Sequence, residues 1–132
     1  MPISAERRNL LRQLDAYLSE LGYSTRRPKR VGVITPEIVR VSPTRGRIVY
    51  GEVVTREDMA KSSCHERLVS FSQRRTRRRA TILLFLATPS EDQGELEELL
   101  KRLDIRSNTR GGHVHVVPMA DAPQRRAAGG GR

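Results

Sequence analysis

The feature that most constrains the fold is an uninterrupted apolar run at residues 80–87, ATILLFLA. Arginines precede it and Pro89 follows it closely. A run of this length is typical of a strand that is covered on both faces. It is too short to span a bilayer. The run therefore predicts a central strand in a sheet with further elements packed on both sides.

Three amphipathic segments supply the covering helices. The first is expected from an N-cap at Ser4 to about residue 21, with Gly22 as a C-terminal stop. The second follows a capping-box pattern at residues 63–66, and the third follows the same pattern at residues 90–93. Their apolar stripes recur at steps of three and four residues. These stripes are Leu10, Leu14, Tyr17, Leu18 and Leu21; Cys64, Leu68 and Phe71; and Leu96, Leu99, Leu100 and Leu103.

The remaining strands are expected around these helices. A β region begins at residues 31–34, residues 37–54 form a hairpin about a turn at 42–46, and residues 113–117 alternate as a final strand. Residues 24–30 are a basic extended link. The element order is helix, strand, strand, strand, helix, strand, helix, strand. It predicts an α/β fold with a central mixed sheet flanked by helices. The single domain covers residues 1–119, and residues 120–132 form a disordered basic tail.

The charge balance predicts a polyanionic partner. The chain of 132 residues has a net charge of +10, and 25 − 3 = 22 of its basic residues are arginines. Arginine matches phosphate oxygens with two parallel N–H groups, so we expect nucleic acid, with DNA favoured over RNA. Codon bias in a GC-rich genome and an acidic protein partner are the alternatives. One cysteine, no signal peptide and no membrane span fit a protein of the reducing cytoplasm.

One acid stands out in the strand expected at residues 47–55. Glu52 shares a face with Ile48, Tyr50 and Val54, next to a glycine that allows a close approach to the backbone. A buried carboxylate needs a cation, a metal ion or water. Glu37 lies on the adjacent strand of the hairpin, so the two carboxylates could together hold one Mg²⁺ or Mn²⁺. The alternative is two solvated acids on a half-exposed hairpin.

These residues carry a resemblance to a known family. Pro36-Glu37 before the hairpin and Gly51-Glu52-Val53 on its second strand resemble the PD-(D/E)XK nuclease-like superfamily, with its restriction-endonuclease-like fold. The resemblance covers roughly residues 5–118. It implies metal-dependent phosphodiester hydrolysis of DNA, with Glu37, Glu52 and the backbone carbonyl of Val53 as metal ligands.

The sequence departs from that pattern at Val54, where the resemblance requires the catalytic lysine. Valine can neither orient a water nor stabilise charge on a phosphate. Either a cation has moved, with Lys61, Arg67 or the arginine run as candidates, or the domain has lost cleavage and kept binding. A magnesium-dependent deoxyribonuclease with Glu37, Glu52 and Lys61 as catalytic residues is therefore the fullest activity that the sequence supports.

An arginine run is the candidate phosphate contact; it comprises Arg74, Arg75, Arg77, Arg78 and Arg79. It lies between two expected core elements, so it is not a tail, and phosphate contacts would position a nucleic acid without reading its sequence. His113 and His115 share a strand face but lack a third metal ligand. Cys64 belongs to an apolar stripe. A non-catalytic nucleic-acid-binding or protein-interaction module, and a basic protein of a ribonucleoprotein, are the alternatives to a nuclease.

Overall fold

The structure is a computed structural model that describes residues 4–27, 34–77 and 79–120. Its helices are α1 (Ala5–Glu20), α2 (Arg56–Met59), α3 (Ser62–Ser72) and α4 (Gln93–Arg102). Its strands are β1 (Ser24–Arg26), β2 (Ile38–Ser42), β3 (Arg47–Val53), β4 (Thr76–Arg77), β5 (Ala80–Pro89) and β6 (Val114–Met119). Short 3₁₀ turns occupy Pro43–Arg45 and Ser90–Asp92. Within this part of the chain, no helix is long and apolar enough to cross a membrane.

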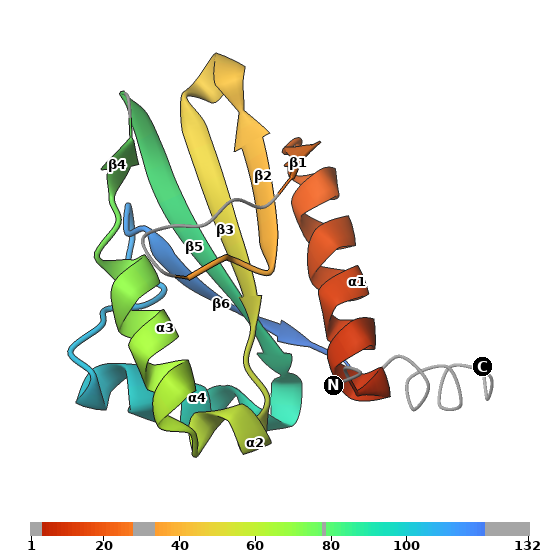
Figure 1. Ribbon diagram of the computed structural model, residues 1–132, viewed down its shortest axis with the longest axis vertical. Coiled ribbons are helices and arrows are strands. Elements are labelled where there is room, and N and C mark those ends of the chain that lie inside the picture. Colours follow the sequence, from red (N-terminus) through yellow and green to blue (C-terminus); the bar gives the residue numbers. More distant parts are fainter. Residues whose placement is uncertain (1–3, 28–33, 78, 121–132) are drawn as a thin grey trace.

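The strands form one mixed sheet of six strands, which confirms the α/β class (Figure 1). β1, β2 and β3 pair antiparallel, whereas β3, β5 and β6 run parallel to one another. β5 lies between β3 on one side and β4 and β6 on the other, because β4 pairs with its beginning and β6 with its later part. The apolar run is therefore a central strand, as predicted.

Helix α1 covers one face of the sheet. The side chain of Ser4 accepts a hydrogen bond from the Arg7 backbone N–H (3.1 Å), and Gly22 follows the helix with a φ of +93°. The buried leucines of α1 pack against Val49, Val53 and Phe85. The glycine of β3 allows this close approach, because a Cβ at Gly51 would lie 3.1 Å from the Leu14 side chain.

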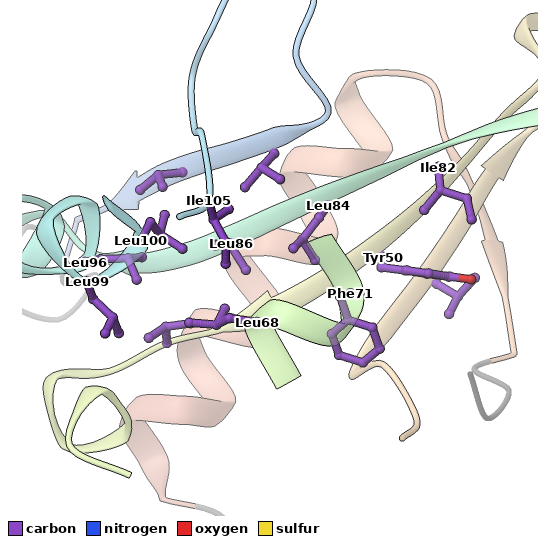
Figure 2. Packing of buried hydrophobic residues seen from close by; sticks show 14 residues of the cluster. Tyr50, Leu68, Phe71, Ile82, Leu84, Leu86, Leu96, Leu99, Leu100 and Ile105 are labelled. Atoms are coloured by element: carbon purple, nitrogen blue, oxygen red, sulfur yellow. The ribbon is translucent and has the colours of Figure 1, made fainter. Parts of the chain in front are cut away.

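Helices α3 and α4 cover the opposite face. Phe71 of α3 is fully buried against Tyr50 of β3, with ring centroids 5.7 Å apart (Figure 2). The leucines of α4 complete this cluster beneath β5 and β6. They are Leu96, Leu99 and Leu100. The predicted stripes of both helices thus face the core.

Both predicted capping boxes are wrong. Helix α3 starts two residues earlier than expected, after Lys61, whose carbonyl accepts the N–H of Cys64 (3.1 Å). Helix α4 follows a 3₁₀ turn and has no side-chain cap either. The capping box of this chain belongs to α2, where Thr55 and Asp58 bond reciprocally. Ser63 instead lies inside the first turn of α3, and Ser90 lies in the 3₁₀ turn that precedes α4.

The edges of the sheet also differ from expectation. The basic link at residues 24–30 forms edge strand β1 over its first three residues, and part of the arginine run forms β4. The β region expected at 31–34 lies outside the described residues except for Ile34, which makes an isolated bridge. The expected final strand extends to Met119 because it pairs with β5 as far as Pro89. Residues 121–132 of the predicted tail lie outside the described part.

The packing of Phe71 yields a prediction. Replacing Phe71 by alanine removes a fully buried ring and leaves a cavity between α3 and β3. We expect a loss of about 3–5 kcal/mol in the free energy of unfolding, measured by urea denaturation. Leu21→Ala, at an exposed position (41%), is the control and should change the free energy by less than about 1 kcal/mol. Equal losses in both variants would contradict the assignment of Phe71 to the core.

Candidate functional site: a carboxylate pair bound by two arginines

The β2–β3 hairpin brings Glu37 and Glu52 together, as the sequence predicts. Ile38 pairs with Gly51, so Glu37 lies opposite Glu52 at the end of the hairpin that is remote from its turn. The backbone N–H of Glu37 donates to Glu52 Oε2 (2.6 Å), and that of Val53 donates to Glu37 Oε1 (2.8 Å). The backbone thus holds both carboxylates in place.

Arg67 of α3 binds Glu52 with two parallel N–H groups. Its Nε donates to Oε1 (2.8 Å) and its Nη2 donates to Oε2 (2.9 Å). Nη2 also donates to the carbonyl of Thr35 (2.9 Å). Glu52 is only 3% exposed, so this guanidinium provides the cation that a buried carboxylate requires.

Arg7 of α1 makes the equivalent contacts with Glu37. Its Nε and Nη2 donate to the two carboxylate oxygens of Glu37 (2.9 and 3.1 Å). Its Nη1 donates to Asp58 Oδ2 (2.6 Å), and Nη2 also donates to the carbonyl of Val53 (3.1 Å). One guanidinium therefore binds two carboxylates and the carbonyl that the resemblance assigns to a metal.

Burial and neighbouring charges shift the pKa values of several groups at this site. Burial, together with the charge of Glu37, raises the pKa of Glu52 to about 7 despite Arg67. Burial alone would raise the pKa of Asp58, but the Thr55 N–H and Arg7 outweigh it and lower that pKa. Burial raises the pKa of the Cys64 thiol to about 11. Cys64 therefore stays a protonated thiol near neutral pH and is no nucleophile.

The arrangement does not fit a divalent cation while both arginines are in place. All four carboxylate oxygens of Glu37 and Glu52 already accept N–H groups, and so does the Val53 carbonyl. In the described part of the chain, no group of three or more His, Cys, Asp or Glu side chains is arranged to hold a metal. Binding of Mg²⁺ or Mn²⁺ by Glu37 and Glu52 stays a prediction that requires both guanidinium groups to move.

The other residues that the sequence predicted for this site differ in how they lie relative to the carboxylate pair. Lys61 lies at the rim of a recess of about 340 Å³ beside the carboxylate pair, and its ammonium is 3.6 Å from Glu57. Val54, at the position of the missing lysine, is buried in the core with Leu68. Arg67 is one of the residues that the sequence offered as a replacement for the missing lysine, and its guanidinium does contact Glu52.

The two histidines of the last strand do not share a site. His113 precedes β6, and its Nε2 lies 2.8 Å from the carbonyl of Ser72. His115 stacks on Phe85 beneath α1, with ring centroids 4.8 Å apart, and burial lowers its pKa.

The arginine run borders a second feature, which we name the strand recess. It is a recess of about 520 Å³ at the start of β5. Its basic lining consists of Arg26, Arg27, Arg77 and Arg79, and its apolar lining of Val39, Val41, Ile48 and Tyr50. Arg47 also borders it, with its guanidinium 3.3 Å from the Tyr23 hydroxyl. Arg78 of the predicted run lies outside the described residues.

Sequence reasoning missed Arg7, Arg26 and Arg27 as site residues. Arg7 precedes Leu10 by three residues on the stripe that continues to Leu14, so it is a charged residue on an apolar helix face. A cation in such a position indicates a buried ion pair. Arg26 and Arg27 had only their charge as a signal, because β1 and β4 are opposite edge strands and only the tertiary structure places these arginines in one recess with Arg77 and Arg79.

Comparison with protein-family models, with curated proteins and with solved structures finds no match to this chain. The resemblance to the PD-(D/E)XK nuclease-like superfamily therefore stays a prediction. It rests on the Pro36-Glu37 and Gly51-Glu52 motifs and on the order of the elements.

The ion pair at Glu52 can be tested by removing its cation. Arg67→Met leaves a buried carboxylate without its partner and should lower the free energy of unfolding by about 3 kcal/mol at pH 7.5. Adding Glu52→Gln removes the charge and should recover much of this loss. Lys101→Met breaks an exposed pair with Glu98 and is the control, with an expected loss below about 1 kcal/mol. A double variant no more stable than Arg67→Met would contradict the pairing.

The raised pKa of Glu52 predicts a pH-dependent stability. An acid whose pKa rises from 4.5 to about 7 on folding binds more protons in the folded state between these values. Its contribution to the free energy of unfolding therefore falls as pH increases from about 4.5 to 7. Relative to Glu52→Gln, the wild type should lose about 2–3 kcal/mol between pH 5 and pH 8.

This comparison isolates Glu52 from the other titrating groups, since they are present in both proteins. Glu57→Gln, whose side chain is 85% exposed, serves as the control and should parallel the wild type. A constant difference between wild type and Glu52→Gln across this range would show that Glu52 is ionised throughout.

Proposed function

We propose that this chain is a nucleic-acid-binding domain that holds the phosphate backbone and does not hydrolyse it. The strand recess is the observation that carries the proposal. The five arginines that line it, Arg47 included, are exposed, and none makes an ion pair with a carboxylate in the part of the chain that the structure describes. No described acid lines the recess. Such uncompensated guanidinium groups attract phosphates and release their counterions.

The distribution of charge supports this assignment. Arginines near the carboxylate pair are neutralised by acids, as Arg7 is by Glu37 and Arg67 by Glu52. The unpaired positive charge that gives the chain its net charge of +10 therefore lies elsewhere, and part of it lines the strand recess. A concentrated basic surface both speeds and strengthens the binding of a polyanion.

Two observations favour binding over hydrolysis. The carboxylate oxygens of Glu37 and Glu52 are occupied by N–H donors, and Val54 is a core residue that has no catalytic group. Magnesium-dependent hydrolysis of DNA is the second candidate, because the hairpin does bring Glu37 and Glu52 together. It would require Arg7 and Arg67 to leave and a cation to enter.

The helices and the single thiol bear on where in the cell the protein resides. No described helix could cross a membrane, and Cys64 is the chain's single cysteine. We propose a cytoplasmic location, where such a thiol stays reduced.

Binding can be measured by fluorescence anisotropy with a labelled 20-base-pair DNA duplex. We expect the logarithm of the affinity to fall linearly with the logarithm of the salt concentration, with a slope of about −3 to −5 for four or five phosphate contacts. Unlabelled polyglutamate is the control competitor, and it should displace the duplex poorly. Affinity indifferent to salt, or displacement by polyglutamate at equal charge, would overturn the proposal.

Hydrolysis is tested in parallel with supercoiled plasmid in Mg²⁺ and in Mn²⁺. We expect no nicking by the wild type above the level of Glu52→Ala. Metal-dependent nicking that disappears in Glu52→Ala would instead establish the nuclease and restore Glu37 and Glu52 as metal ligands.

A further inference from the structure

A second basic recess lies on the other side of the arginine run, and we name it the loop recess. It measures about 660 Å³ and is formed where the end of α3 meets the connection from α4 to β6. Arg75, Arg106, Arg110 and His113 line it, together with one acid, Asp104. The three arginines are exposed and make no ion pair with a described acid. Its polar character excludes a site for an apolar ligand.

One short segment connects the two recesses. Arg75 lines the loop recess, whereas Arg77 and Arg79 line the strand recess. The segment is held to the sheet, because the carbonyl of Arg75 accepts the N–H of Ile82 (2.9 Å) and Thr76 pairs with Thr81. The guanidinium groups are thus carried by strand β4 and its turn rather than by a free loop, so both recesses belong to one basic surface.

This surface lies away from the carboxylate pair. It surrounds the beginning of β5 and the turn before β6, whereas Glu52 lies near the end of the parallel strand β3. In Figure 1, β4 and the start of β5 are at the top, and α2, which follows β3, is at the bottom. Five residues of strand separate Arg47 from Glu52, which is about 16 Å at 3.3 Å per residue.

The aromatic side chains indicate which form of nucleic acid fits. Proteins that bind single strands stack bases on exposed aromatic rings. This chain has only three tyrosines and two phenylalanines, and four of the five are less than 7% exposed. The exception is Tyr17 (36%), which lies on α1 next to Phe85, on the other face of the sheet from the strand recess. The basic surface therefore offers phosphate contacts without a stacking platform.

We infer that the strand and loop recesses together bind the backbone of a nucleic-acid duplex, across β4 and away from Glu37 and Glu52. This inference rests on the proposed function and adds where the nucleic acid binds and that it is double-stranded. Bases remain paired and stacked, so binding depends on phosphate spacing and not on sequence. The carboxylate pair acts as a structural ion-pair cluster and does not contact the duplex.

Reversing the charge of two arginines at a time tests where the duplex binds. Arg77→Glu/Arg79→Glu alters the strand recess and Arg106→Glu/Arg110→Glu the loop recess. Each changes the net charge from +10 to +6, since 10 − 4 = 6. Arg8→Glu/Arg12→Glu, at exposed positions of α1, changes the charge equally and is the matched control. Affinity for the 20-base-pair duplex should fall about tenfold or more for each recess variant, with a salt slope smaller by about 2. The control should change affinity less than about threefold.

The form of the ligand is tested with the same duplex, its separate single strand and an RNA duplex of the same sequence. Either duplex should bind at least about tenfold more tightly than the single strand. Arg77→Gln/Arg79→Gln repeats the comparison without added acids if the glutamate variant fails to fold, as judged by circular dichroism.

The outcomes separate the two proposals. A wild type that binds no nucleic acid removes the proposed function. If the wild type binds but the α1 control weakens binding as much as the recess variants, net charge alone is responsible and the assigned surface is wrong. If the single strand binds as tightly as the duplex, the inference that the ligand is double-stranded is wrong.

Discussion

The ion pair between Glu52 and Arg67 is the interaction on which the rest of this site depends. A carboxylate that is 3% exposed cannot remain charged without a cation close by, and α3 supplies it. Glu37 is bound in the same way from α1 through Arg7. Because α1 and α3 cover opposite faces of the sheet, the two pairs connect both helical layers at the end of the hairpin. Breaking one pair would leave a buried charge, which costs more than the intact pair contributes.

This arrangement divides the charge of the molecule into two regions. Near the end of β3, arginines and acids neutralise each other in hydrogen-bonded pairs. Around the start of β5, arginines from β1, β4 and the α4–β6 connection converge with only Asp104 among the acids that line the recesses. We propose that a polyanion binds the second region and not the first, since paired charges at short range cancel. The arginines in ion pairs and the arginines proposed to bind phosphates are therefore separate in space.

Much of the fold followed from local pattern. The apolar run at residues 80–87 predicted a strand covered on both faces, and β5 has this position because two parallel strands, β3 and β6, flank it and helices cover both faces of the sheet. The stripes of α1, α3 and α4 predicted their buried leucines, since helical periodicity alone decides which residues share a face. Tyr17 and Leu21 were wrongly included in the stripe of α1, because both are exposed. The capping boxes at Ser63 and Ser90 were wrong because the same four-residue pattern also occurs inside a first turn, as at Ser63, and in a 3₁₀ turn before a helix, as at Ser90.

The sequence by itself determined that Glu37 and Glu52 meet, because a hairpin with a turn at residues 42–46 places them opposite each other. It also indicated that a buried Glu52 needs a cation, a metal ion or water as its partner. Only the tertiary structure decided that the partners are cations: Arg67 and Arg7 reach the pair from helices 15 and 30 residues distant in sequence. The packing of both helices, not any local motif, sets those distances. The convergence of Arg26, Arg77 and Arg79 on the strand recess was likewise decided by the tertiary structure, because β1 and β4 lie at opposite edges of the sheet and no short-range pattern brings them together.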